Sequence, residues 1–250
     1  MTLTTLEVAA IPRIGHDEAM VLAETEFTRM VDLLRQLSTE EWQRQTVCEL
    51  WDVRAMVAHV LGMAEAQASV RQFAHDFRAA RRRKGGLMID AMTSTQVRDR
   101  AQLTPEQLVH RLGDVAPRAV RARRRTPAVV RWGVRMKQDP PFDDHRWPYA
   151  YLVDIVFTRD TWVHRLDICR ATGREMVLTP EHDGRLVADV AAEWASRHGQ
   201  PFTLILTGVA GGEWGSGLAG ERIELDALDF CWTLAGRAPG AGLLGTIVPF

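Results

Sequence analysis

The sequence predicts an α+β protein, with a helical bundle over residues 1–178 and a smaller α/β domain over residues 179–250. Two observations lead to this division. Before the boundary, several long segments carry apolar residues every three or four positions, which is the period of an amphipathic helix. After it, a short β-type run and a cluster of glycines indicate strands joined by turns.

The composition is that of an ordinary soluble protein, with 46% apolar and 25% charged residues. The 31 basic residues nearly balance the 32 acidic ones, so neither nucleic acid nor an anionic membrane is an expected partner. Basic runs at 81–84 and 121–125 contain no aromatic residues of the kind that stack on bases. The three cysteines are widely spaced, and no stretch approaches the ~18 apolar residues of a membrane span. We therefore expect a cytoplasmic protein without disulfides.

The first helices are predicted from their caps and periodicity. Residues 17–37 have one apolar face, and Ser38 with Glu41 forms a capping box for a short helix. Asp52 can then cap a long helix, which is predicted to run unbroken to about Ala80.

The next long helix begins at Thr104, whose cap is completed by Gln107, and Pro117 is expected to kink or split it. Residues 126–147 contain several prolines and no clean period, so they are predicted to be a long connection.

A fourth long helix is predicted from Pro148 to Thr172, with Gly173 as its C-terminal glycine cap. In the second domain we expect a helix over 179–198 and a last helix capped by Asp226. The strands between these two helices are predicted at residues 202–207 and 222–225, with a glycine-rich hairpin between them.

Two of the predicted helices carry polar side chains on otherwise apolar faces. His59 lies far around its helix from the exposed stripe of Arg54 and Glu65, so its imidazole is predicted to face the interior. On the fourth helix, Asp160 and His164 are four residues apart and project in the same direction. Burying such groups costs several kcal/mol unless a partner or a cation compensates them.

A divalent cation shared by His59, Asp160 and His164 would supply that compensation, as in metal sites built inside helical bundles. Two imidazoles and a carboxylate suit zinc, and also nickel, iron or cobalt, and three protein ligands leave a position for water or substrate. The alternative is a metal-free core, in which Asp160 and His164 form an ion pair and His59 is simply hydrogen-bonded.

Three sets of segments carry a family resemblance: 48–54 leading into 58–60, then 158–168 continuing to 171–174, and 235–237 with the ending 242–250. In these residues the chain resembles the mycothiol-dependent maleylpyruvate isomerase family of actinobacteria, within the wider DinB/YfiT-like metal-binding superfamily. The resemblance implies a DinB-like four-helix bundle that holds the metal and a C-terminal domain similar to sterol-carrier-like α/β folds.

In the family, a histidine on the second helix and a glutamate and a histidine four apart on the fourth bind the metal. The matching positions here are His59, Asp160 and His164. The departure from the family pattern is Asp160. Its shorter carboxylate leaves three alternatives: coordination at a changed angle, coordination through water, or no coordination. The resemblance also implies that Arg237 binds a substrate carboxylate as a bidentate fork, against the alternative of a solvated arginine at a helix end.

The resemblance implies mycothiol or a related thiol as cosubstrate and a small, unsaturated, anionic substrate. The metal would lower the pKa of the thiol and hold a thiolate ready to add to the double bond. Expulsion of the thiol after rotation makes the enzyme an isomerase, and retention makes it a thiol transferase. A rival hypothesis is a non-catalytic bundle stapled by the cation, whose second domain binds a ligand or partner; whether the chain is a monomer or a homodimer stays open.

Neighbouring residues leave further alternatives. Asp167 can orient a metal-binding histidine or pair with Arg170 or Arg174. Cys48 can approach the metal or be a small buried residue, and Trp51 is interpreted as a core aromatic.

Overall fold

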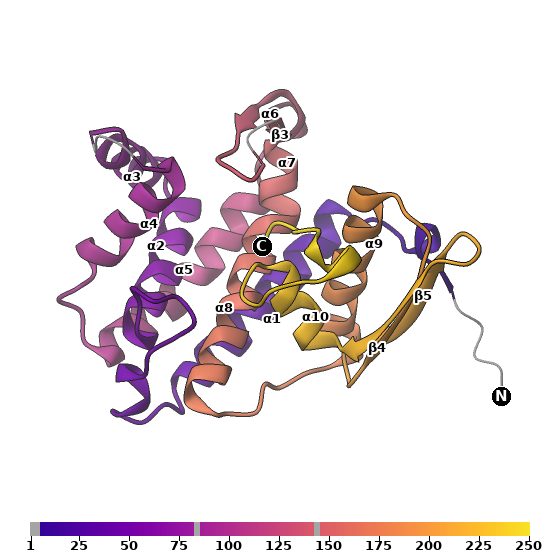
Figure 1. Cartoon of the computed structure of the whole chain (residues 1–250). Helices are drawn as coiled ribbons and strands as arrows, with labels where there is room; N and C mark the ends of the chain where they lie inside the picture. Colours follow the sequence, from indigo (N-terminus) through magenta and orange to yellow (C-terminus); the bar gives the residue numbers. More distant parts are fainter. Residues whose placement is uncertain (1–5, 83–85, 143–145) are drawn as a thin grey trace. The chain divides into compact units, whose positions relative to one another are not determined.

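The structure is a computed structural model that describes residues 6–82, 86–142 and 146–250 (Figure 1). Part of the basic run at 81–84 lies outside these ranges. The chain divides into two compact units, one of Gly15–Glu175 and one that joins Met1–Ile14 to Met176–Phe250. The first unit is mostly helical and the second contains a four-stranded sheet, so the predicted α+β class is confirmed. No helix among the described residues is long and apolar enough to cross a membrane.

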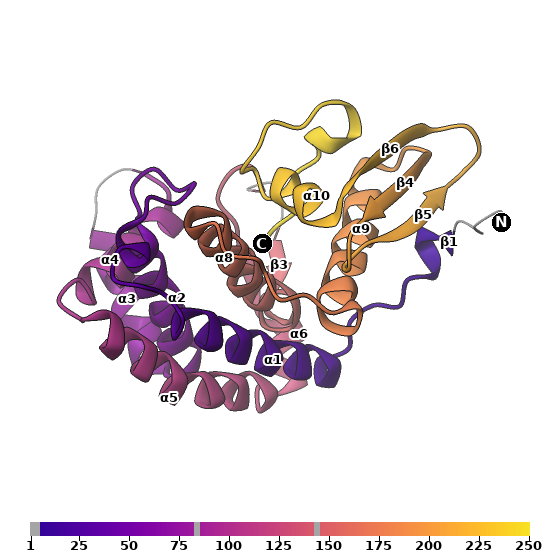
Figure 2. The ribbon, with the colours of Figure 1, turned by 90° about the horizontal axis from the view of Figure 1, so that it is seen from below.

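The helical unit is built on long helices that pack against one another. Its main helices are α1 (His16–Leu34), α2 (Val53–Ala68), α3 (Val70–Arg82), α4 (Met88–Asp99), α5 (Pro105–Arg124) and α8 (Phe157–Thr172). Helix α1 contacts α5 and α8, and α2 contacts the same two helices. Figure 2 shows α1 and α5 running side by side. The apolar faces of these four helices form the core of the unit, which includes Met30, Leu61, Leu108 and Trp162.

The prediction of one unbroken helix from Asp52 to Ala80 was wrong. Asp52 does cap α2, since its side chain accepts a hydrogen bond from the Ala55 amide at 2.7 Å. The helix ends at Ala68, however, because Ser69 has extended backbone angles (φ −146°, ψ 115°), and α3 starts afresh at Val70. Neither glycine nor proline marks this break.

Helix α4 was not predicted, although α2 and α3 both pack against it. The stretch 126–147 was predicted to be a connection, yet it contains α6 (Ala128–Gly133) and strand β2 (Arg135–Lys137), which pairs with β3 (Arg146–Pro148). Helix α5 continues through Pro117 without splitting.

The predicted caps of the other long helices are confirmed. Thr104 and Gln107 form the reciprocal capping box of α5. The fourth long helix starts as α7 (Tyr149–Tyr151), passes through a π-helical turn (Leu152–Val156) and continues as α8. Gly173 ends α8 in the left-handed conformation (φ 74°), as expected of a C-terminal glycine cap.

The second unit has a sheet of order β1-β5-β4-β6. Strands β4 (Phe202–Thr207) and β5 (Gly212–Ser216) are antiparallel, β6 (Glu221–Asp226) is parallel to β4, and β1 (Leu6–Glu7) is parallel to β5. The pairing of β1 explains why the first residues belong to this unit rather than to the helices that follow them.

Two helices complete the second unit. They are α9 (Arg185–His198), which follows a π-helical turn (Pro180–Gly184), and α10 (Ala227–Leu234), which Asp226 caps as predicted. The Trp194 ring of α9 is fully buried, with its centroid 4.8 Å from that of Phe202 and 5.5 Å from that of Phe230. These contacts form the core of the unit.

Candidate metal centre

The structure brings His59, Asp160 and His164 together inside the helical unit. His59 is 3% exposed, which confirms that α2 carries its imidazole inward. The carboxylate oxygen Oδ1 of Asp160 lies 3.8 Å from Nε2 of His59 and 3.5 Å from Nε2 of His164. The two rings meet edge to face, with centroids 5.1 Å apart. Both Nε2 atoms therefore converge on one carboxylate.

The opposite nitrogen of each ring is engaged by a second residue. Nδ1 of His164 lies 2.9 Å from Oδ2 of Asp167, which is on the same helix and fully buried. Nδ1 of His59 lies 2.8 Å from Oε1 of Gln96. Both partners are acceptors, so each Nδ1 donates its proton to one of them and each Nε2 is the nitrogen that faces Asp160.

This arrangement fits a divalent cation. A tetrahedral ion with bonds of the length typical for zinc separates its ligand atoms by roughly 3.4 Å. The two separations measured from Asp160 are close to that value, and all three candidate ligand atoms lie within 4.8 Å of one another. Metal-binding histidines characteristically donate their other ring N–H to an acceptor, as both do here.

Without a cation, Asp160 and His164 stabilise each other's charged forms. Burial disfavours the charge on Asp160, but the charge and hydrogen bond of His164 and the contact with His59 outweigh it, so the pKa of Asp160 lies below its usual range. Burial also disfavours a charged His164, yet Asp160 and Asp167 raise its pKa to about 9. The carboxylates of Asp160 and Asp167 thus stabilise positive charge on the His164 ring.

Asp160 is the most accessible of the three residues. Its side chain is 19% exposed, against 4% for His59 and 6% for His164. Of the three candidate ligands, the carboxylate of Asp160 is therefore the one that solvent reaches most easily.

Trp51 lies at the site rather than in a core, so its interpretation as a core aromatic was wrong. Its ring is half-buried, with its centroid 5.1 Å from that of His59 and 6.4 Å from that of His164. The loop before it is held by Gln45, whose amide donates to the carbonyls of Cys48 and Trp51. Cys48 in this loop is also half-buried.

Sequence reasoning missed Gln96 because it missed α4, and glutamine is not a residue type that signals a metal site. The structure gives Asp167 and Arg174 different partners. Asp167 bonds His164, whereas Arg174 makes a bidentate pair with Glu41 at 2.6 and 2.9 Å.

Arg237 belongs to the other unit, just after α10, and its guanidinium donates to the Ala235 carbonyl at 3.1 Å. Its predicted role in binding a substrate carboxylate stays a prediction.

Comparisons with known proteins point to one family. A family profile described as the mycothiol maleylpyruvate isomerase N-terminal domain matches residues 23–169, more than half of the chain. A search of curated proteins gave no significant match.

Two solved structures share the fold. A crystal structure of the mycothiol-dependent maleylpyruvate isomerase aligns with a TM-score of 0.58 at 17% identity, covering 94% of this chain and 93% of that one. A mutant of that isomerase with a histidine replaced by alanine aligns with a TM-score of 0.56 at 16% identity and the same coverage. With the profile match, these findings show that the chain belongs to the mycothiol maleylpyruvate isomerase family.

Proposed function

We propose that this protein is a metal-dependent enzyme that uses mycothiol or a related low-molecular-weight thiol on a small, unsaturated, anionic substrate. The observation that carries the proposal is the convergence of two imidazole Nε2 atoms on the Asp160 carboxylate, with both Nδ1 atoms bonded to acceptors. Membership of the family supports the thiol as cosubstrate. We place the activity in the cytoplasm, where thiols remain reduced.

In this proposal His59, Asp160 and His164 hold one divalent cation, zinc in the first instance. A bound cation would lower the pKa of a thiol and stabilise its thiolate at neutral pH. The protein's own residues provide the rest. Asp167 accepts a hydrogen bond from the His164 ring, and the indole of Trp51 lies against the ring of His59.

In the proposed isomerisation, the thiol adds to the substrate and is released again, so it is not consumed. The sulfur adds to one carbon of the double bond and a proton to the other, so that the bond between them becomes single and can rotate. Loss of the sulfur as thiolate, together with one proton from the neighbouring carbon, restores the double bond in the opposite geometry, which is isomerisation. If the adduct is released before elimination, the product is a thioether and the enzyme is a thiol transferase.

Arg237 completes the proposal as the group that binds a carboxylate of the substrate. A guanidinium can meet a carboxylate with two parallel hydrogen bonds, which a lysine cannot reproduce. Arg237→Lys should therefore raise the KM of an anionic substrate about tenfold, while the metal content stays that of the wild type.

The test is thiol binding followed by turnover. Calorimetry should detect mycothiol binding to zinc-loaded protein and none after the zinc has been removed with a chelator. NMR of the vinyl protons should then show isomerisation of maleylpyruvate only when zinc and thiol are both present. Equal thiol binding with and without metal would refute the proposal, and unfolding of the helical unit on chelation would favour the structural staple instead.

A further inference from the structure

Helix α4 approaches α2 closely at Gly62, three residues after His59. A Cβ atom on Gly62 would lie 2.5 Å from Cβ and 2.7 Å from Cγ of Gln96. These atoms of Gln96 are next to its backbone, so they cannot move aside unless α4 moves as well. The missing side chain at Gly62 is therefore what allows Gln96 to reach His59 from the neighbouring helix.

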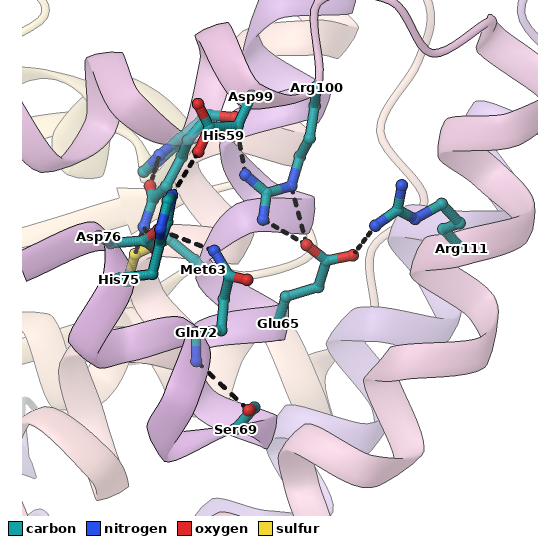
Figure 3. A network of polar contacts seen from close by, with 11 residues as sticks. His59, Met63, Glu65, Ser69, Gln72, His75, Asp76, Asp99, Arg100 and Arg111 are labelled. Atoms are coloured by element: carbon teal, nitrogen blue, oxygen red, sulfur yellow. Dashed lines mark hydrogen bonds and ion pairs between the residues drawn. The ribbon is translucent and has the colours of Figure 1, made fainter. Parts of the chain in front are cut away.

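The amide of Gln96 is held in one orientation by its other partners, and Figure 3 shows the network around them. Its Nε2 lies 3.4 Å from Oδ2 of Asp76 and 3.4 Å from Sδ of Met63. With its nitrogen toward Oδ2 of Asp76, the amide turns its oxygen toward Nδ1 of His59.

Asp76 is fixed in turn. It is fully buried, and its Oδ1 accepts a hydrogen bond of 2.8 Å from Nε2 of Gln72. Burial raises the pKa of Asp76, while the amides of Gln72 and Gln96 and the charge of Arg100 oppose that change. The chain of contacts from Gln72 through Asp76 to Gln96 thus ends on Nδ1 of His59.

We propose that Gln96 is a positioning residue for the metal centre, with Gly62 as the position that admits it. Gln96 keeps the proton of His59 on Nδ1 and fixes the ring plane, so that Nε2 is presented to the cation. This inference rests on the proposed metal site. The two ligand histidines are then oriented by unlike groups, since His164 has a carboxylate from its own helix and His59 has a neutral amide from another.

The first test reads the imidazole directly and does not need the metal. In protein labelled with ¹⁵N-histidine, the Nδ1–H of His59 should give a slowly exchanging proton signal, both metal-free and zinc-loaded. Gln96→Met, which keeps the volume but removes the acceptor, should abolish this signal in both states. The control is Thr95→Val, because the buried hydroxyl of Thr95 donates to the Ala91 carbonyl within α4 and the signal should survive.

The second test measures Co²⁺ affinity by absorption. Gln96→Met should weaken binding about 10- to 100-fold, as expected when the partner of a ligand histidine is lost. Gly62→Ala should weaken it in the same range and should add little to Gln96→Ala, because both changes remove the same contact.

The outcomes separate the two proposals. A wild-type signal and wild-type affinity in Gln96→Met would overturn the role of Gln96 while leaving the metal site intact. If the wild type binds no metal, the proposed function fails, and the proton signal still decides whether Gln96 orients His59. Thermal melting of each variant beside Thr95→Val identifies a loss caused only by misfolding.

Discussion

Asp160 is the candidate ligand at which this chain differs from the glutamate that the family resemblance leads us to expect. An aspartate is one methylene shorter than a glutamate, yet the structure still places its Oδ1 within 3.8 Å of both Nε2 atoms. It is also the ligand with the greatest exposure, so a water molecule can occupy its place if the carboxylate is removed. His164 has no such substitute, because it is buried and bonded to Asp167.

We therefore predict that His164→Ala empties the metal site more completely than Asp160→Ala. After dialysis against limiting zinc, elemental analysis should find almost no metal in His164→Ala. Asp160→Ala should retain zinc at affinity lowered by roughly tenfold or more. Asp114→Ala, which removes an exposed carboxylate beside His110 on α5, is the matched control and should bind like the wild type. Equal metal content in the wild type and His164→Ala would overturn the ligand assignment.

At the residue scale, the candidate ligands could be found from the sequence because each follows a local rule. Spacing of four on a helix placed Asp160 and His164 together, and the apolar neighbours of His59 directed it inward. Gln96 could not be found in this way. Its contact with His59 depends on how two helices pack, and Gly62 alone, seen in the sequence, indicates only a small residue inside a helix.

At the scale of elements, helix ends were predictable where the chemistry is local. Asp52, Thr104, Gly173 and Asp226 all cap helices as expected. The break at Ser69 and the existence of α4 were not predictable in this way. Helix α4 contains two threonines and a serine, which have weak helix propensity. Packing against α2 and α3 stabilises it instead.

Helices α1 and α8 are joined by a fully buried ion pair, with Nε of Arg165 2.7 Å from Oε1 of Glu26. Removing the charge of Glu26 takes from the buried guanidinium of Arg165 the carboxylate that two of its nitrogens contact. Glu26→Gln should therefore lower the free energy of unfolding by about 3–5 kcal/mol. Replacing the pair by Leu and Met should recover most of this loss.

Urea denaturation of the single and double variants measures both effects. Asp32→Asn serves as the control, because Asp32 pairs with Arg35 on the exposed face of α1 and its loss should leave the unfolding midpoint almost unchanged. A double variant no more stable than Glu26→Gln would contradict this account of the pair.

For the whole molecule, the change from helical periodicity to strands and glycines was enough to predict the α+β class. The membership of residues 6–14 was not predictable, since the two residues of β1 join a strand some two hundred residues later in the chain. The matched profile at 23–169 lies within the unit Gly15–Glu175, and all three candidate ligands belong to that unit as well.

Metal removal should consequently affect one unit and spare the other. A cation present at 100 times its Kd stabilises the folded state by about 2.7 kcal/mol, and chelation removes that contribution. Hydrogen exchange read by mass spectrometry should show faster exchange in α2, α4 and α8 after chelation. The strands β4, β5 and β6 supply no ligand, so their exchange should not change, and equal acceleration there would contradict a cation bound only in the helical unit.

The ligands of α2 and α8 are separated by on the order of a hundred residues of chain, a loop whose closure costs considerable entropy. During synthesis on the ribosome, His59 on α2 emerges long before Asp160 and His164 on α8. Until then, His59 lacks the other two candidate ligands. Under the proposed function, the cation would therefore be captured only after α8 has docked onto α2. Metal binding would then require the packed helical unit and not only the formation of its separate helices.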